Sequence, residues 1–268
     1  MLHARRWSWV LVLVVGIVLY ELVLRGVVAT GNPNLVPALI LLGAAVVPAA
    51  FVAFVAGLRL VFAVHGPVVA GTALVGGVIG VVAAGVLEYR TLNRLGFLPM
   101  FAVGLIEEAA KLIVPIVLVL FLRRDRHPAD GLLIGVASGA GFAVLETMGY
   151  AFVVLIQSQG DLAAVQQVLF QRGVLSPAAH MAWTGLTAAA LWRAATEHWH
   201  PRALLGFAGV FLVAVLLHTA WDSAPNLTID VVVAAVSLVL LWWTTHRLAA
   251  PHRRERPPAT LVPPMAYR

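Results

Sequence analysis

The segment Glu107-Glu108-Ala109-Ala110-Lys111 places two adjacent carboxylates and an ammonium group inside an apolar run from Phe97 to Leu122. That run is long enough to cross a bilayer. Ionisable groups are costly in hydrocarbon, so such a cluster is by default a candidate functional site. Lys111, the only lysine of the chain, follows Glu107 by four residues and Glu108 by three. On a helix it can therefore pair with both.

Three further apolar segments carry polar groups that a passive membrane span would not need. They contain Glu146, His180, and the pair His218 and Asp222. His218 and Asp222 are four residues apart and so lie on one helical face. A carboxylate at this spacing can hold an imidazole in one tautomer.

Carboxylates and imidazoles in a partly wetted membrane pocket suit the activation of water, by either of two routes. A divalent metal held by imidazole and carboxylate lowers the pKa of its bound water to about 7. A glutamate can act as general base without a metal. No serine-based triad is evident, and the sequence contains no His-Glu-x-x-His segment, so a zincin-type protease is not indicated. The same groups could instead pack the helices, relay protons in an ion-coupled transporter, or belong to a non-catalytic scaffold.

The composition is that of an all-α polytopic membrane protein. The 268 residues are 61% hydrophobic and 11% charged, with a mean hydropathy of +0.94, against 45–50% apolar residues in typical soluble domains. The net charge of +6 needs no nucleic acid partner, because basic loops on one side of a membrane supply it. The absence of cysteine excludes disulfides and thiolate chemistry.

Hydropathy predicts about eight transmembrane helices within a single domain, residues 1–250, followed by a disordered cytoplasmic tail, residues 251–268. The predicted spans are Trp7–Ala29, Leu35–Gly57, Pro67–Leu87, Phe97–Leu122, Gly131–Gln157, Val174–Ala195, Ala203–Asp222 and Leu227–Leu248. Arginines gather in alternate connecting segments, which predicts that both termini face the cytoplasm of a multi-pass plasma membrane protein. At about 1.5 Å of rise per residue, the polar groups of four spans then share the outer half of the bilayer.

Two local patterns predict how the polar spans pack. Gly131, Gly135 and Gly139 recur every four residues, a ridge that lets another helix approach closely. Glu146 lies two turns beyond Gly139 and should point into the bundle. Pro115 has no N–H, so the carbonyl of Lys111 loses its usual helical partner. This predicts a kink, or a free backbone acceptor, beside the acid cluster.

At these residues the sequence resembles the PrsW family of intramembrane proteases, relatives of the CAAX-prenyl-protease and bacteriocin-processing membrane proteins. The resemblance rests on motifs that occur in the family's order: Glu107-Glu108-x-x-Lys111, Gly141-Phe142-x-x-x-Glu146, Arg172, His180 followed by Thr184-Gly185, and His218-x-x-Trp221-Asp222. It implies hydrolysis of peptide bonds in membrane-anchored proteins, such as anti-sigma factors, near the outer face.

We therefore predict an intramembrane endopeptidase that works within the lipid bilayer. Its predicted catalytic residues are Glu107, Glu108, Lys111, Glu146, His180, His218 and Asp222. Glu107 or Glu108 would activate water, Lys111 would tune their charge, and Asp222 would orient His218. Glu146, His180 and His218 would bind a divalent metal, with zinc the first candidate, or complete the groups that activate water.

Overall fold

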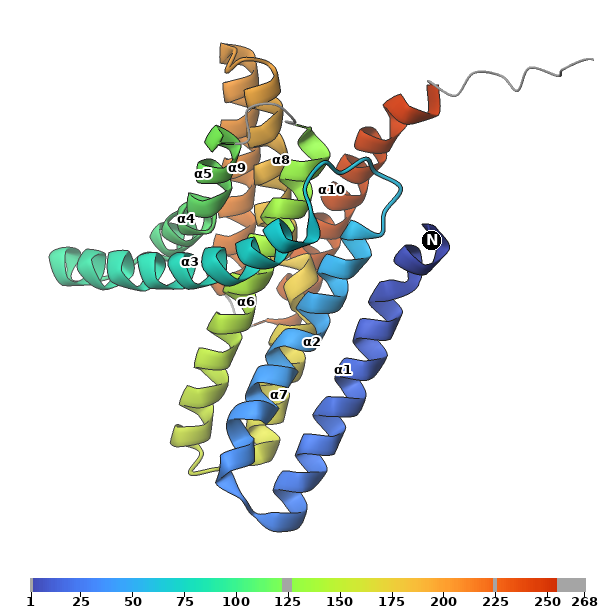
Figure 1. Ribbon diagram of the computed structural model, residues 1–268. Coiled ribbons are helices and arrows are strands. Elements are labelled where there is room, and N and C mark those ends of the chain that lie inside the picture. The colour runs from blue at the N-terminus through green and yellow to red at the C-terminus, as the bar shows by residue number, and fades with distance from the viewer. Residues whose placement is uncertain (1, 122–126, 224–225, 255–268) are drawn as a thin grey trace, which may run out of the picture.

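The computed structural model describes residues 2–121, 127–223 and 226–254, and every regular element in these ranges is a helix (Figure 1). The α-helices are α1 (Leu2–Thr30), α2 (Val36–Ala56), α3 (Gly66–Leu95), α4 (Met100–Lys111), α5 (Ile113–Phe121), α6 (Pro128–Gln157), α7 (Leu162–Leu175), α8 (His180–Thr196), α9 (Pro201–Ser223) and α10 (Leu227–Arg254). Two short 3₁₀ helices, η1 (Pro33–Leu35) and η2 (Ser176–Ala178), precede α2 and α8.

Six helices of the described chain are long and apolar enough to cross a membrane, which confirms an all-α polytopic membrane protein. They are α1, η1 continued by α2, α3, α6, α9 and α10. The prediction of eight continuous spans was too high by two. The predicted spans Phe97–Leu122 and Val174–Ala195 are each interrupted, and both interruptions lie next to the predicted catalytic residues.

The first interruption separates α4 from α5 at Leu112, directly after Lys111. Pro115 cannot donate to the carbonyl of Lys111. That carbonyl instead accepts a hydrogen bond of 2.7 Å from the hydroxyl of Ser138 on α6. The predicted break beside the acid cluster is therefore present, and the freed backbone acceptor is satisfied by a neighbouring helix.

The second interruption separates α7 from α8 at the segment Ser176–Ala179. Pro177 lies at the start of η2, and Ala179 adopts φ −117° and ψ −116°, outside the helical region. His180 is consequently the first residue of α8 rather than a residue inside a long span. Discontinuous helices in membrane proteins expose backbone and polar groups where these line a cavity or a binding site.

Helices α6 and α8 form the centre of the molecule, and the predicted glycine ridge is what brings them together. A Cβ atom on Gly131 would come within 2.6 Å of the Ala188 carbonyl, and one on Gly139 within 2.5 Å of the His180 carbonyl. Only glycine permits this distance between the two backbones. The ridge thus fixes His180 beside Gly139 on α6. Glu146 lies about two turns further along that helix.

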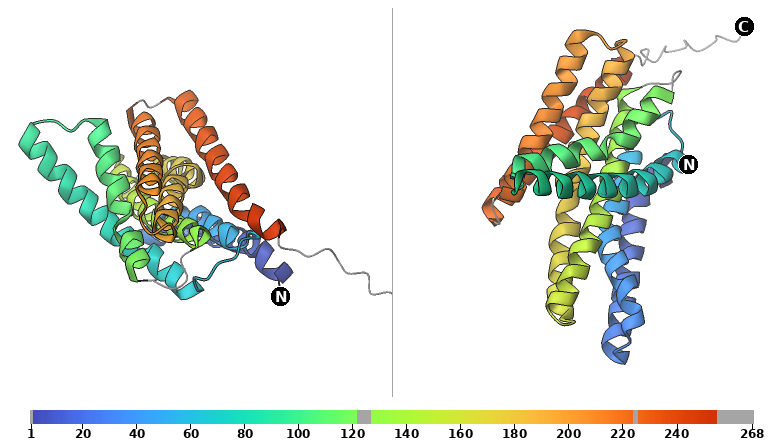
Figure 2. Two further views of the ribbon diagram at one scale, coloured as in Figure 1. Left: turned by 90° about the horizontal axis from the view of Figure 1, so that it is seen from above. Right: turned by 90° about the vertical axis from the view of Figure 1, so that its left-hand side faces the viewer.

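Helix α3 runs across the other long helices instead of beside them, and together with α4 it forms a hairpin that projects from the bundle (Figures 1 and 2). At the crossing, Gly77 of α3 meets the backbone of Gly141 on α6. Further along α3, Ala84 packs with Ala110 and Phe142. The hairpin therefore covers the face of α6 that carries Phe142.

Helix α10 continues to Arg254, so residues 251–254 of the predicted tail are helical. Residues 255–268 lie outside the residues that the structure describes. The predicted cytoplasmic location of both termini stays a prediction.

Candidate active site

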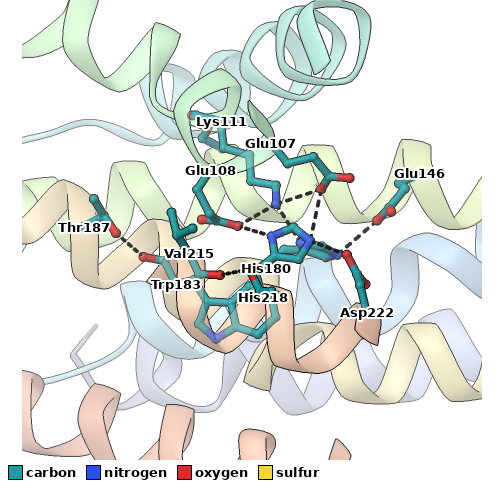
Figure 3. Close-up of polar contacts among 12 residues, drawn as sticks. Glu107, Glu108, Lys111, Glu146, His180, Trp183, Thr187, Val215, His218 and Asp222 are labelled. Carbon is teal, nitrogen blue, oxygen red and sulfur yellow. Dashed lines mark hydrogen bonds and ion pairs between the residues drawn. The ribbon is translucent and has the colours of Figure 1, made fainter. Parts of the chain in front are cut away.

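Lys111 lies at the centre of a buried polar cluster between α4, α6, α8 and α9 (Figure 3). Its Nζ atom is 2.7 Å from Glu108 Oε1, 3.1 Å from Glu107 Oε2 and 2.8 Å from His180 Nδ1. The contacts with Glu108 and His180 are hydrogen bonds, and the contact with Glu107 is an ion pair. The ring of Phe142 closes the remaining side, with its centroid 4.3 Å from Nζ.

His218 on α9 is held between carboxylates on both of its ring nitrogens. Nδ1 is 2.8 Å from Glu108 Oε1. Nε2 is 3.1 Å from Asp222 Oδ2 and 3.5 Å from Glu107 Oε2. A ring nitrogen that faces only carboxylate oxygens must carry either a proton or a metal ion. The arrangement thus creates a position for a positive charge at Nε2.

His180 on α8 has a defined tautomer in this arrangement. Because Lys111 can only donate, Nδ1 of His180 must accept, and the ring proton then resides on Nε2. Nε2 lies 3.0 Å from Glu146 Oε2, at ion-pair distance, so its proton faces that carboxylate. The same Oε2 atom is 2.6 Å from Nη2 of Arg172 on α7. His180 therefore links the buried lysine to the partly exposed pair of Glu146 and Arg172.

Trp183 supports both histidines from one side. Its ring centroid lies 5.5 Å from that of His180 and 5.0 Å from that of His218. Its indole N–H donates to Ser237 Oγ on α10 at 2.8 Å. Sequence reasoning missed this residue, although it follows His180 by three residues and so occupies the same helical face.

All seven residues of the predicted site lie in this one cluster, and Arg172 joins it. The family model for PrsW family intramembrane metalloproteases matches residues 33–245. The chain belongs to this family. Membership makes the protein an intramembrane protease that acts on membrane-embedded protein substrates, and it implies a divalent metal. No curated protein and no solved structure gave a significant match.

The residues of this PrsW family member fit the divalent metal that the family implies. Among the described residues, ligand atoms of Glu107, His180 and His218 all lie within 4.8 Å of one another. Two imidazoles and a carboxylate are a ligand set typical of catalytic zinc sites. Glu146, which the sequence assigned as a ligand, is not in this group. Glu107 is the carboxylate of this group, and the assignment of Glu146 as a ligand stays a prediction.

The Oε2 atom of Glu107, like the Oε2 atom of Glu146, accepts no hydrogen bond from the described residues. It is buried and faces Lys111 and His218 at ion-pair distance, but it makes no hydrogen bond within the described chain. Buried polar atoms are nearly always hydrogen-bonded in native proteins. An orphaned carboxylate oxygen beside two imidazoles is what a site for a cation or a water molecule requires.

Proposed function

We propose that the protein cleaves membrane-anchored proteins at the cluster of Glu107, Glu108, His180 and His218, where a water molecule is activated for attack on the peptide bond. The observation that supports this most is the convergence of three helices, α4, α8 and α9, on a buried group of three potential metal ligands. Among the described residues, four carboxylates of the cluster (Glu107, Glu108, Glu146 and Asp222) contact two permanent cations, Lys111 and Arg172. A divalent cation would balance the excess negative charge.

In this proposal Glu107, His180 and His218 hold the metal, and zinc suits this mixture of nitrogen and oxygen donors. When bound, zinc supplies Lewis acidity and lowers the pKa of its water to about 7. Nε2 of His180 faces Glu146 at ion-pair distance, and Nδ1 accepts from Lys111. Metal binding through His180 therefore requires one of these two contacts to open.

The two adjacent glutamates have different partners, and this suggests different roles. Oε1 of Glu108 contacts both Lys111 and His218 at 2.7–2.8 Å. It is fixed and fully compensated, which suits an orienting role. Glu107 keeps an oxygen with no hydrogen bond. We therefore assign the direct contact with the reacting centre to Glu107 rather than to Glu108. Glu107 would be a ligand when a metal is bound, or the base that deprotonates water in a route without a metal.

Lys111 and Asp222 act through these groups. Lys111 is fully buried, and its ammonium group contacts Glu107, Glu108 and His180, so this residue neutralises the glutamates and does not bind the substrate. Asp222 accepts from His218 Nε2 and holds that ring in place. Arg172 has a buried Nε atom with no hydrogen-bond partner in the described residues, and this donor is available to a substrate carbonyl.

The proposed substrates are proteins anchored in the plasma membrane, with anti-sigma factors as the class that the family resemblance suggests. The predicted topology places the cleavage in the outer half of the bilayer. Glu146, Arg172 and Asp222 keep partial exposure, and a substrate segment can reach the cluster from that side.

The test is proteolysis of a membrane-anchored substrate by the purified, reconstituted protein, with bound metal quantified on the same samples. We expect Glu107→Gln, Glu108→Gln and His218→Ala each to lower kcat/KM by about 10³-fold or more, since each removes a group from the water-activating set. Metal content should fall in His218→Ala and His180→Ala.

The matched control is Glu197→Gln, which removes an exposed carboxylate that pairs with Arg193, four residues earlier in the sequence. It should leave both proteolysis and metal content unchanged. Full proteolytic activity in the three site variants would overturn the assignment of this cluster as the active site.

A further inference from the structure

Glu88 on α3 is a carboxylate that sequence reasoning did not connect with the site. It lies on the covering hairpin, well before the Glu107-Glu108 segment, and it has no motif around it. Its Oε1 atom is buried and has no hydrogen-bond partner within the described residues. Leaving a buried carboxylate oxygen unsatisfied is costly, so such an atom calls for a functional explanation.

The packing of α3 directs Glu88 toward the site. Gly80 lies against Phe142 and the Ala110 carbonyl. Ala84, one turn later, packs with Ala110 and Phe142. Glu88 is one further turn along the same helical face. Ala110 precedes Lys111, and Phe142 faces Lys111 and His180, so this face of α3 follows the edge of the cluster.

The charges around Glu88 agree with this placement. Its carboxylate interacts electrostatically with Glu146, His218, Lys111 and Asp222, and it in turn acts on Glu107. Two of these residues, Glu146 and Asp222, are the partly exposed members of the cluster. Glu88 is itself only partly buried, and we therefore infer that it lies near the exposed edge of the cluster, from which a substrate would approach.

A substrate that is cleaved inside a membrane presents a particular need at this position. The segment around the cleaved bond must unwind, and its N–H groups then lose their helical partners. Water is scarce in the hydrocarbon region, so each unsatisfied N–H costs several kcal/mol. A carboxylate oxygen that the protein leaves free can accept such a group.

We propose that Glu88 is a substrate-positioning residue whose Oε1 atom accepts a hydrogen bond from a backbone N–H of the unwound substrate segment. This proposal rests on the proposed function, because it takes the cluster as the place of cleavage. It adds a contact from α3, and so makes the α3–α4 hairpin part of the substrate-binding surface.

Steady-state kinetics of Glu88→Ala and Glu88→Gln, with a substrate whose cleavage position has been mapped, test this role. Glu88→Ala should raise KM by about ten- to a hundredfold and change kcat less than about threefold, as loss of a hydrogen bond to a charged acceptor predicts. Glu88→Gln keeps a carbonyl acceptor, so its KM should exceed the wild-type KM by only about three- to tenfold. Thr91→Ala, an exposed residue of the same helix, is the control and should match the wild type.

A second measurement separates substrate binding from an effect on folding. Substrates with a single ester in place of one amide near the cleaved bond lack one N–H. One such ester should weaken cleavage by wild-type protein and, less strongly, by Glu88→Gln, yet have no further effect in Glu88→Ala. Unchanged kinetics in Glu88→Ala, an equal fall of kcat in both variants, or an ester effect in Glu88→Ala as large as in the wild type would each overturn the proposal.

A failure of the role of Glu88 can be distinguished from a failure of the active-site assignment. His218→Ala, measured with the same substrate, reports on the cluster itself. If His218→Ala is inactive while Glu88→Ala equals the wild type, the role of Glu88 fails and the proposed function stands. If His218→Ala remains active, the proposed function fails first.

Discussion

The inner and outer parts of the polar cluster are built differently. The inner part, Lys111, Glu108 and His218, has side chains that are 0–1% exposed, whereas Glu146, Arg172 and Asp222, the rim, are 17%, 26% and 29% exposed. Every short contact of the inner part is matched donor to acceptor. The rim also forms ion pairs, but it keeps a surface that a substrate can reach.

This difference indicates that the inner part and the rim have different roles in catalysis. Fixed charges in a region without water stabilise the charge of a transition state more than the same charges do in water, and they need no reorganisation during the reaction. The inner part provides such an environment, because the charges hold one another in place. The rim residues position the inner ones and lie closest to an incoming peptide. Removing an inner charge should therefore damage folding and activity together, whereas a rim substitution should affect activity alone.

The largest effect is expected for Lys111→Met. This substitution leaves Glu107 and Glu108 buried without their shared cation, and breaking a buried charge network in this way costs about 3–5 kcal/mol. Thermal unfolding in detergent should show a marked loss of stability, and proteolysis should be abolished.

The matched variant for Lys111→Met is the triple substitution Glu107→Gln, Glu108→Gln and Lys111→Met, which removes both signs of charge at once. It should recover much of the lost stability while remaining inactive. If Lys111→Met alone unfolds at the wild-type temperature, the inner part does not depend on charge balance.

An intermediate effect is expected for Asp222→Asn on the rim. Residues that orient a ligating or catalytic imidazole typically contribute about 10- to 100-fold, so kcat/KM should fall by about that factor while the unfolding temperature stays close to the wild-type value. Ser223→Ala, the neighbouring substitution, removes only a hydroxyl bonded within its own helix and should have no effect. If Asp222→Asn unfolds at a clearly lower temperature than the wild type, a rim substitution affects stability as well as activity, and the proposed difference between the rim and the inner part is wrong.

The smallest effect on activity is expected for Ser138→Ala. It leaves the carbonyl of Lys111 without its partner at the break between α4 and α5. An unsatisfied buried carbonyl costs about 1–3 kcal/mol, and the unfolding temperature should fall accordingly, with activity reduced less than about threefold. Thr187→Ala is the control, because this equally buried hydroxyl bonds to the carbonyl of Trp183 on its own helix. Equal unfolding temperatures for the two variants would argue against a special role for the break.

Much of the site follows from local sequence alone. Lys111 with Glu107 and Glu108, and His218 with Asp222, are pairs within one helix, and the helical repeat of 3.6 residues fixes their proximity. The glycine ridge of α6 and the break near Pro115 follow in the same way, since glycine permits close helix contact and proline removes a donor. The apolar runs determine a polytopic α-helical membrane protein.

The tertiary structure decided everything that joins separate helices. The contacts of Lys111 with His180 and of Glu108 with His218 span 69 and 110 residues of sequence, and no periodic pattern specifies them. The same holds for the choice of α8 as the partner of the glycine ridge, for Glu107 instead of Glu146 among the three potential ligands, and for the approach of Glu88. These depend on how whole helix surfaces fit together, because side-chain packing and the pairing of buried polar groups select one arrangement among many that the hydropathy pattern allows.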